Sequence, residues 1–140
     1  MPRTTTLAAT CLRWRAQGVL LEGASGAGKS DLALRLLDAG AQLVADDAVR
    51  IERVAARLVA RPAGLAGHLE VRGLGIYVVP HAAATALDLV VVLAAGPGVR
   101  LPPPSRRRLL GVELPLIELD PQLASAVARI RLALEGRRVA

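Results

Sequence analysis

Short apolar runs separated by turn residues dominate the pattern of this chain. Residues 18–22 and 41–45 are brief and mostly apolar, and residues 87–93 form the run richest in β-branched side chains. Runs of this length bounded by turn residues are typical of buried strands, since helices need a longer periodic pattern. We therefore predict strands over residues 5–14, 18–22, 41–45 with a continuation over 48–54, 69–72, 76–79, 87–93 and 114–119.

Two segments carry apolar residues at the spacing of a helix. The first covers residues 30–38, and Gly40 stands where a glycine commonly ends a helix. The second should begin at Asp120 as N-cap with Pro121 at the first helical position, and it should end at Gly136. The apolar faces consist of Leu32, Ala33, Leu36 and Leu37 in the first helix and of Leu123, Val127, Ile130 and Leu134 in the second.

The predicted strands outnumber the predicted helices, and residues 96–98 and 102–104 mark an exposed loop rich in Gly and Pro. Regular alternation of strand and helix, as in a doubly wound fold, is missing from this pattern. We therefore predict an α/β fold with a mixed, strand-rich sheet and a C-terminal helix. At 140 residues the chain has the size of one domain, which we assign to residues 1–140.

The composition is that of a globular protein with an aliphatic core, because 53% of the residues are hydrophobic and there is no Phe, one Trp and one Tyr. We expect no membrane span, since no apolar run approaches the roughly 20 residues that cross a bilayer, and we expect no secretion signal. Cys11 is the one cysteine, so no internal disulfide can form. A cytoplasmic location is the simplest expectation.

The formal net charge is +6, and part of it lies in residues 106–108 and 137–138. Such charge favours polyphosphates, nucleic acid or an acidic protein partner, although a solvated arginine face explains it equally well. Trp14 and Tyr77 are the only aromatic residues, so basic and aromatic side chains do not interleave. We therefore expect no nucleic-acid partner.

The single lysine of the chain lies in a glycine-rich segment between the first predicted buried strand and the first predicted helix. The segment fits the phosphate-loop pattern G-x-x-x-x-G-K-[ST] without a mismatch. In that setting the loop N–H groups and the helix N-terminus converge on phosphate oxygens, while Lys29 reaches the β- and γ-phosphates and Ser30 binds Mg²⁺. The predicted phosphate-binding residues are Gly23, Ala24, Ser25, Gly26, Ala27, Gly28, Lys29 and Ser30.

Two further polar groups follow the phosphate loop. Asp46 and Asp47 stand at the end of a predicted strand, where one acid could hold Mg²⁺ and the other accept a proton from an attacking hydroxyl. Neighbouring strand residues point to opposite sides, so both acids reach one site only if the chain turns there. Glu70 and Arg72 alternate and should share a strand face, either adding to the metal and phosphate site or forming a surface ion pair.

The order of these three motifs resembles the HPr serine kinase/phosphorylase family, in its short proteobacterial form. The resemblance rests on the loop over residues 23–30, the segment Leu43-Val44-Ala45-Asp46-Asp47 and the segment Leu69-Glu70-Val71-Arg72-Gly73-Leu74-Gly75-Ile76. It implies an ATP- and Mg²⁺-dependent kinase that phosphorylates a serine of the phosphocarrier HPr and also phosphorolyses phosphoserine-HPr with inorganic phosphate. It further implies a homo-oligomer, with a hexamer as the usual form.

The same resemblance implies roles for individual residues. Asp46 and Asp47 supply the catalytic acid/base and the metal contact, and Ser30, Asp47 and Glu70 form the metal site. Arg100 resembles the phosphate-binding arginine of the family. Arg72, Gly73 and Gly75, together with the loop over residues 94–108, frame the entrance for the protein substrate. Ala8 stands where family members usually have a histidine.

Three functions remain open on the sequence alone. The first is the HPr serine kinase. The second is a nucleotide- or phosphate-binding regulatory protein of the same family with weak catalysis, which the replacement at Ala8 and the missing N-terminal domain of full-length members favour. The third is a small-metabolite kinase, because an acid pair shortly after a phosphate loop also occurs in such enzymes.

Overall fold

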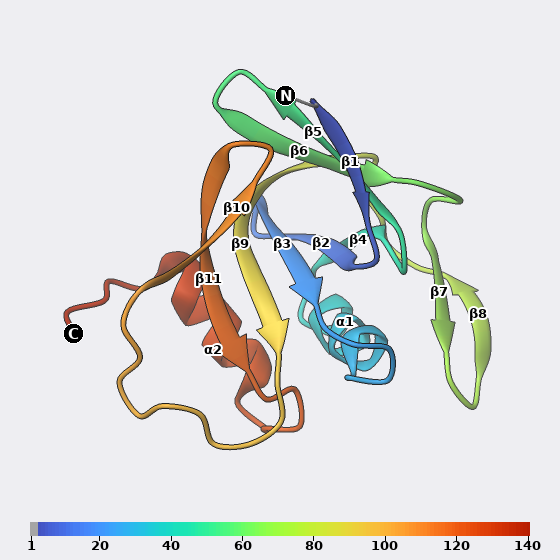
Figure 1. The fold of residues 1–140 in the computed structure, drawn as a ribbon. Helices are drawn as coiled ribbons and strands as arrows, with labels where there is room; N and C mark the ends of the chain where they lie inside the picture. Colours follow the sequence, from blue (N-terminus) through green and yellow to red (C-terminus); the bar gives the residue numbers. More distant parts are fainter. Residues whose placement is uncertain (1–2) are drawn as a thin grey trace.

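A computed structural model describes residues 3–140 as thirteen short elements, of which two are helices (Figure 1). The elements before the long central strand are β1 (Thr4–Leu7), β2 (Thr10–Trp14), β3 (Gln17–Glu22), α1 (Lys29–Asp38), β4 (Gln42–Ala45), β5 (Val49–Val54), β6 (Arg57–Pro62), β7 (His68–Val71) and β8 (Gly75–Val78). The remainder are β9 (Thr85–Leu93), β10 (Ser105–Leu109), β11 (Val112–Leu119) and α2 (Ala126–Glu135).

Nine of the strands form one mixed sheet. Its main path runs β1-β5-β6-β9-β3-β2-β4, and the hairpin β10–β11 joins it where β11 pairs with β9. The strands β3, β9 and β11 are parallel to one another, whereas all other pairings in this sheet are antiparallel. The strands β7 and β8 form a separate two-stranded sheet. The predicted mixed, strand-rich α/β fold is therefore confirmed.

The central strands bury both of their faces. Successive side chains of β3 alternate, so Leu21 packs in the cluster beneath α1 and α2 while Leu20 packs in a second cluster on the opposite face. The first cluster includes Leu32 and Leu36 from α1 and Ile130 from α2. Figure 1 shows both helices on one side of β3, β9 and β11, with β1, β5 and β6 at the other end of the molecule. This two-sided burial explains why the central strands are continuous apolar runs.

The prediction of one strand over residues 5–14 is wrong, because the extended structure is interrupted at Ala8 and Ala9. The first part, β1, pairs with β5, whereas β2 pairs with β3 and β4. The prediction also missed β6 and β10. Both carry arginines within short segments, and their extended conformation comes from pairing with β5, β9 and β11 rather than from a local apolar pattern.

The predicted start of the last helix is also wrong. Asp120 Oδ1 accepts the Gln122 N–H at 2.9 Å, and Leu123 N–H donates to Asp120 O at 3.3 Å, so the residues after β11 form a turn. The helix begins only at Ala126, with Ser125 as N-cap. Asp120 therefore caps a turn instead of a helix, because the same side-chain acceptor serves either structure. The end of the helix at Gly136 is confirmed.

Candidate functional site

The glycine-rich segment forms a loop between β3 and α1. The strand ends at Glu22, the loop closes with a hydrogen bond from Ala27 N–H to Ala24 O at 3.0 Å, and the helix begins at Lys29. Gly28 is the helix N-cap with φ 105°, a backbone conformation that side chains with a Cβ adopt at a cost. The predicted order of strand, loop and helix is therefore present, and the helix N-terminus faces the space above the loop.

The side chain of Lys29 lies along the loop that precedes it. Its ammonium donates to Gly23 O at 2.5 Å and to Ala24 O at 3.3 Å. An ammonium has three donors, so two are held by loop carbonyls. This arrangement fixes a positive charge inside the curve of the loop, where a phosphate chain would bring negative charge.

The acid pair follows β4 at a turn. Asp46 Oδ1 accepts hydrogen bonds from Thr10 Oγ1 at 3.0 Å and from Ser30 Oγ at 3.5 Å. Asp47 has φ 66°, so the chain turns between the two acids and both side chains line the same cavity. The turn satisfies the condition under which two neighbouring acids can serve one site.

Burial raises the pKa of Asp46 above its ordinary value. The hydrogen bonds from Thr10 and Ser30 act in the opposite direction, and the neighbouring Asp47 charge adds to the increase. The Asp46 carboxylate is thus partly desolvated and has hydroxyl donors but no cationic partner among the hydrogen bonds and ion pairs of residues 3–140. A cation or a proton would stabilise it.

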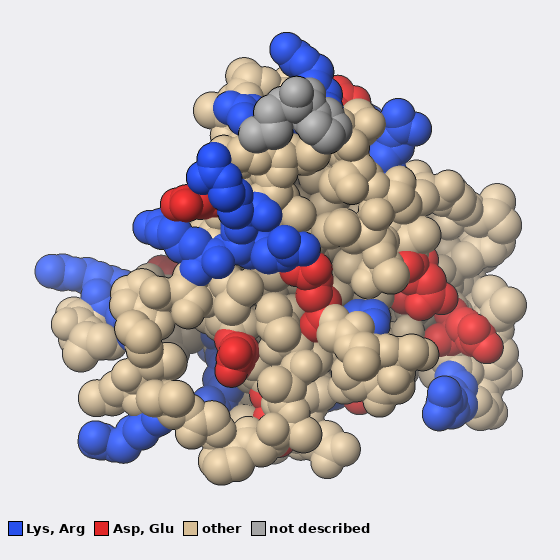
Figure 2. Space-filling view, in the orientation of Figure 1, with Lys and Arg blue, Asp and Glu red and all other residues tan. Residues whose placement is uncertain are grey.

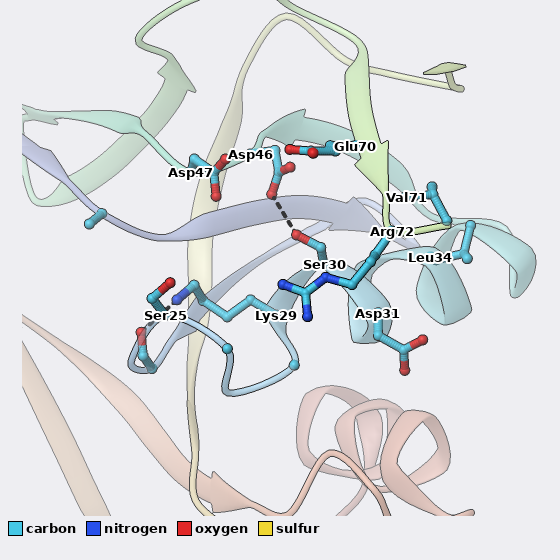
Figure 3. A pocket seen from close by; sticks show the side chains of 14 residues that line it. Ser25, Lys29, Ser30, Asp31, Leu34, Asp46, Asp47, Glu70, Val71 and Arg72 are labelled. Carbon is cyan, nitrogen blue, oxygen red and sulfur yellow. Dashed lines mark hydrogen bonds between the residues drawn. The ribbon is translucent and has the colours of Figure 1, made fainter. Parts of the chain in front are cut away.

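These groups surround a cavity of about 700 Å³ (Figure 3). Figure 3 shows Lys29, Ser30 and the two acids around the same space, with Glu70 above and Arg72 extending over it from the end of β7. A volume of this size is in the ordinary range for a small-molecule site. The cavity is lined by Ala8, Gly23, Ser25, Gly26, Gly28, Lys29, Ser30, Asp31, Leu34, Asp46, Asp47, Glu70, Val71 and Arg72.

The structure thus brings together most of the residues that the sequence singled out. Ala24 and Ala27 belong to the loop but do not line the cavity, and neither do Gly73 and Gly75 of the β7–β8 turn. Arg100 lies exposed in the segment between β9 and β10, also outside the cavity, so its phosphate-binding role stays a prediction. The expectation that Glu70 and Arg72 share a strand face is wrong, since β7 ends at Val71 and Arg72 begins the turn.

Two polar contacts at the site were not anticipated. Thr10 is fully buried and positions Asp46, and its only signal in the sequence is a hydroxyl residue inside an apolar strand. Glu22, the residue before the loop, accepts two hydrogen bonds from Arg107 of β10 at 2.9 and 3.1 Å. Figure 2 shows arginines gathered over β10 with acidic side chains beside them. The partner of Glu22 is 85 residues away in sequence, so no local pattern predicts the pair.

Oxygen ligands for a metal ion line this cavity. Among residues 3–140 no group of three or more His, Cys, Asp or Glu side chains is arranged to hold one. The oxygens of Ser30, Asp46 and Asp47 are hard donors of the kind that Mg²⁺ accepts, and Mg²⁺ is commonly shared between one or two carboxylates and substrate phosphates.

In the described part of the chain, neither helix has the length and apolar character that crossing a membrane requires.

Comparisons with known proteins agree on one family. The model of the HPr Serine kinase C-terminal domain matches residues 1–86. The HPr kinase/phosphorylase of Clostridium tetani is 45% identical over 78 residues, which cover 54% of this chain and 26% of that protein. The HPr kinase/phosphorylase of Bordetella petrii is 47% identical over 75 residues, covering 52% and 24% respectively. The chain therefore spans about a quarter of the length of these curated relatives.

A solved structure extends the similarity to nearly the whole chain. The structure of the Hpr(Ser) kinase/phosphatase from Coxiella burnetii superposes with a TM-score of 0.76 and 27% sequence identity. The match covers 94% of this chain and 93% of that chain. The structural likeness therefore reaches well beyond residue 86, where the match to the family model ends.

Proposed function

Because this chain belongs to the HPr serine kinase C-terminal domain family, we propose that it transfers the γ-phosphoryl group of ATP, with Mg²⁺, to a serine of the phosphocarrier HPr. The observation that carries this proposal is the convergence of Lys29, Ser30, Asp46 and Asp47 on one cavity. Phosphoryl transfer depends mainly on positioning and charge neutralisation, and this cavity offers groups for both. The choice of HPr as the protein substrate is based on the names of the relatives.

The residues of the cavity suit Mg²⁺ and a nucleotide phosphate chain. The raised pKa of Asp46 marks a carboxylate that burial has left short of positive charge, and the Ser30 hydroxyl lies 3.5 Å from it. Ser30 and Asp47 would hold Mg²⁺, with Glu70 at the rim of the same cavity. When bound, Mg²⁺ would neutralise charge on the phosphate oxygens.

The remaining steps depend on the loop, on the start of α1 and on the acid pair. Lys29 offers a fixed positive charge to the phosphate chain, and the N–H groups at the start of α1 orient its oxygens. Asp46 is the candidate to accept the proton of the serine hydroxyl, because burial raises its pKa and so increases its affinity for a proton. The more exposed Asp47 is then left for the metal.

A phosphotransfer assay tests the proposal. HPr is incubated with the protein, γ-labelled ATP and a series of Mg²⁺ concentrations, beside the Lys29→Ala variant. We expect label on an HPr serine, reduced by at least about 100-fold in the variant, because a charge that stabilises the transition state is lost. Label that does not depend on Lys29, or no label at any Mg²⁺ concentration, would refute the kinase.

Ala8 favours a second candidate function, a nucleotide-binding regulatory protein with weak catalysis. Ala8 is exposed, lines the cavity, and has no proton to exchange, whereas the family usually has a histidine there. The Ala8→His variant distinguishes the two. A large gain in transfer or phosphorolysis, with unchanged ATP affinity, would mark the natural chain as a weak catalyst, while an active wild type with no gain would favour the enzyme.

A further inference from the structure

A second hollow adjoins the phosphate loop. It has a volume of about 400 Å³ and shares Gly26, Gly28 and Asp31 with the larger cavity. Its other wall is formed by Arg35 of α1 and by Pro121 and Gln122, which follow β11. The acids Asp46, Asp47 and Glu70 line the larger cavity alone. A phosphate chain lying on the loop therefore has the acids on one side and this hollow on the other.

The topology of the sheet explains why the hollow lies there. The strands β3, β9 and β11 are parallel neighbours, with Glu22 opposite Val92 and Val92 opposite Glu118. Their carboxyl ends therefore meet at one edge, where the loop leaves β3 and the turn at residues 120–125 leaves β11. In open α/β sheets, ligands bind outside the carboxyl ends of the strands. A ligand held by the loop thus extends naturally toward the turn after β11.

The wall after β11 is held in place by several contacts. Asp120 Oδ1 accepts the Gln122 N–H at 2.9 Å, and its Oδ2 accepts the Gly96 N–H at 3.2 Å. Arg35 Nη2 donates to Pro121 O. A Cβ placed on Gly28 would lie 3.3 Å from Pro121 Cγ, so the proline ring packs directly against the loop. The hollow is preformed, which lowers the conformational cost of binding.

The chemistry of the hollow suits an uncharged, flat ligand rather than a phosphate. Asp31 lies 3.2 Å from Arg35, so the two charges compensate each other. Pro121 is buried and closes the wall of the hollow, whereas Ala27 is half-buried and apolar, and the planar guanidinium of Arg35 can stack on a ring. The exposed amide of Gln122 has both donors and acceptors, as the edge of a nucleobase requires.

The geometry points to this hollow as the nucleoside subsite, in which the base of the nucleotide packs on Ala27 and Arg35 and its edge meets the Gln122 amide. This inference rests on the proposed function, since it adds the nucleoside to a phosphate chain already held by the loop. It assigns a nucleotide-binding role to residues 121–122, far outside the phosphate loop in sequence.

The test compares two ligands on the same variants by titration calorimetry with Mg²⁺ present. ATP carries the nucleoside, and inorganic tripolyphosphate offers a phosphate chain without it. The Gln122→Ala variant should bind ATP about three- to ten-fold more weakly, the value of one hydrogen bond, and should bind tripolyphosphate as the wild type does. Gln42→Ala is the matched control, because Gln42 is also an exposed glutamine and lies outside both cavities. It should change neither affinity.

Each other outcome overturns a defined part of the inference. If Gln122→Ala leaves ATP affinity unchanged, or weakens both ligands equally, the nucleoside lies elsewhere. If instead Leu34→Ala, in the larger cavity, selectively weakens ATP, the base lies beside α1 and β7. If the wild type binds neither ligand, the proposed nucleotide site itself fails. Circular dichroism of each variant confirms that the fold is retained.

Discussion

Replacing Glu22 by Gln removes the carboxylate that the Arg107 guanidinium grips with two hydrogen bonds, at 2.9 and 3.1 Å. The pair joins β10 to the residue immediately before the phosphate loop. It is half-buried, with side-chain exposures of 33% for Arg107 and 21% for Glu22, and the carboxylate raises the pKa of the guanidinium. We expect the pair to stabilise the fold by a measurable amount.

The magnitude lies between two known limits. Exposed ion pairs contribute about 0.2–1 kcal/mol. Hydrogen bonds to charged groups in less exposed sites contribute about 1.5–3 kcal/mol. The two-pronged geometry and the partial burial of Glu22 and Arg107 give an expected coupling energy of about 1.5 kcal/mol in the free energy of unfolding. The chain supplies its own control, because Arg108 and Glu113 are 3.7 Å apart with exposures of 66% and 52%. That pair should couple by less than about 0.5 kcal/mol.

The assay is a double-mutant cycle on each pair, with the free energy of unfolding taken from urea titrations. The first cycle uses Glu22→Gln and Arg107→Gln, and the second uses Arg108→Gln and Glu113→Gln. Raising the salt concentration should reduce the coupling of the exposed pair more than that of the half-buried pair. A coupling energy for Glu22 and Arg107 no greater than that of the control pair would refute the reasoning.

Other predictions test the core and the acid pair. Burial raises the pKa of Asp46, so protonation of Asp46 stabilises the folded state relative to the unfolded chain. This stabilisation is complete below the carboxyl pKa of the unfolded chain, about 4, and is lost as the pH rises through the higher pKa of the folded state. Asp46→Asn should abolish phosphoryl transfer. The variant should nevertheless unfold at a higher urea concentration than the wild type near about pH 7, and at the same urea concentration near about pH 3. An equal gain in stability at the two pH values would contradict the charge explanation. A Cβ on Gly18 would lie 1.9 Å from Ala86 O, so Gly18→Ala should cost about 3 kcal/mol or more in the free energy of unfolding. At Gly64 a Cβ meets nothing within 4 Å, so Gly64→Ala, the matched control, should change it by less than about 0.5 kcal/mol; equal effects would be the contrary result. Cys11 is fully buried, and burial raises its pKa far above the usual range, so a thiol reagent should modify it only after urea unfolds the protein; rapid labelling of the folded chain would show that the strand opens.

The features predicted correctly from the sequence are those set by local pattern. The order of strand, loop and helix around residues 23–30 follows from a short apolar run, glycines and an apolar helical face that lie side by side in the chain. The central strands β3 and β9 are buried on both faces, so continuous apolar composition is sufficient to identify them. The end of α1 is fixed by Gly40, whose φ of 102° suits glycine best.

The features that the sequence did not reveal depend on distant partners. The strand β10 owes its extended form to β11, and its Arg107 meets Glu22 from across the sheet. The turn that lets both acids line the cavity depends on the positive φ of Asp47, which the sequence does not reveal. The side chain of Asp120 could cap either a helix or a turn. In the structure it accepts hydrogen bonds from the N–H groups of Gln122 and Gly96, which stabilise the turn.

The three arginines of β10 have a consequence for how copies of this chain could meet. In the described chain β10 pairs only with β11, so its other edge presents free backbone groups to any approaching strand. Two copies joined edge to edge through β10, about a twofold axis, would bring Arg106 and Arg108 of each copy onto one face, while Arg107 points to the other face and pairs with Glu22. Like charges facing across strands repel, so this route to a continuous intermolecular sheet is electrostatically disfavoured. A symmetric assembly of this chain should therefore not pair its copies edge to edge through β10.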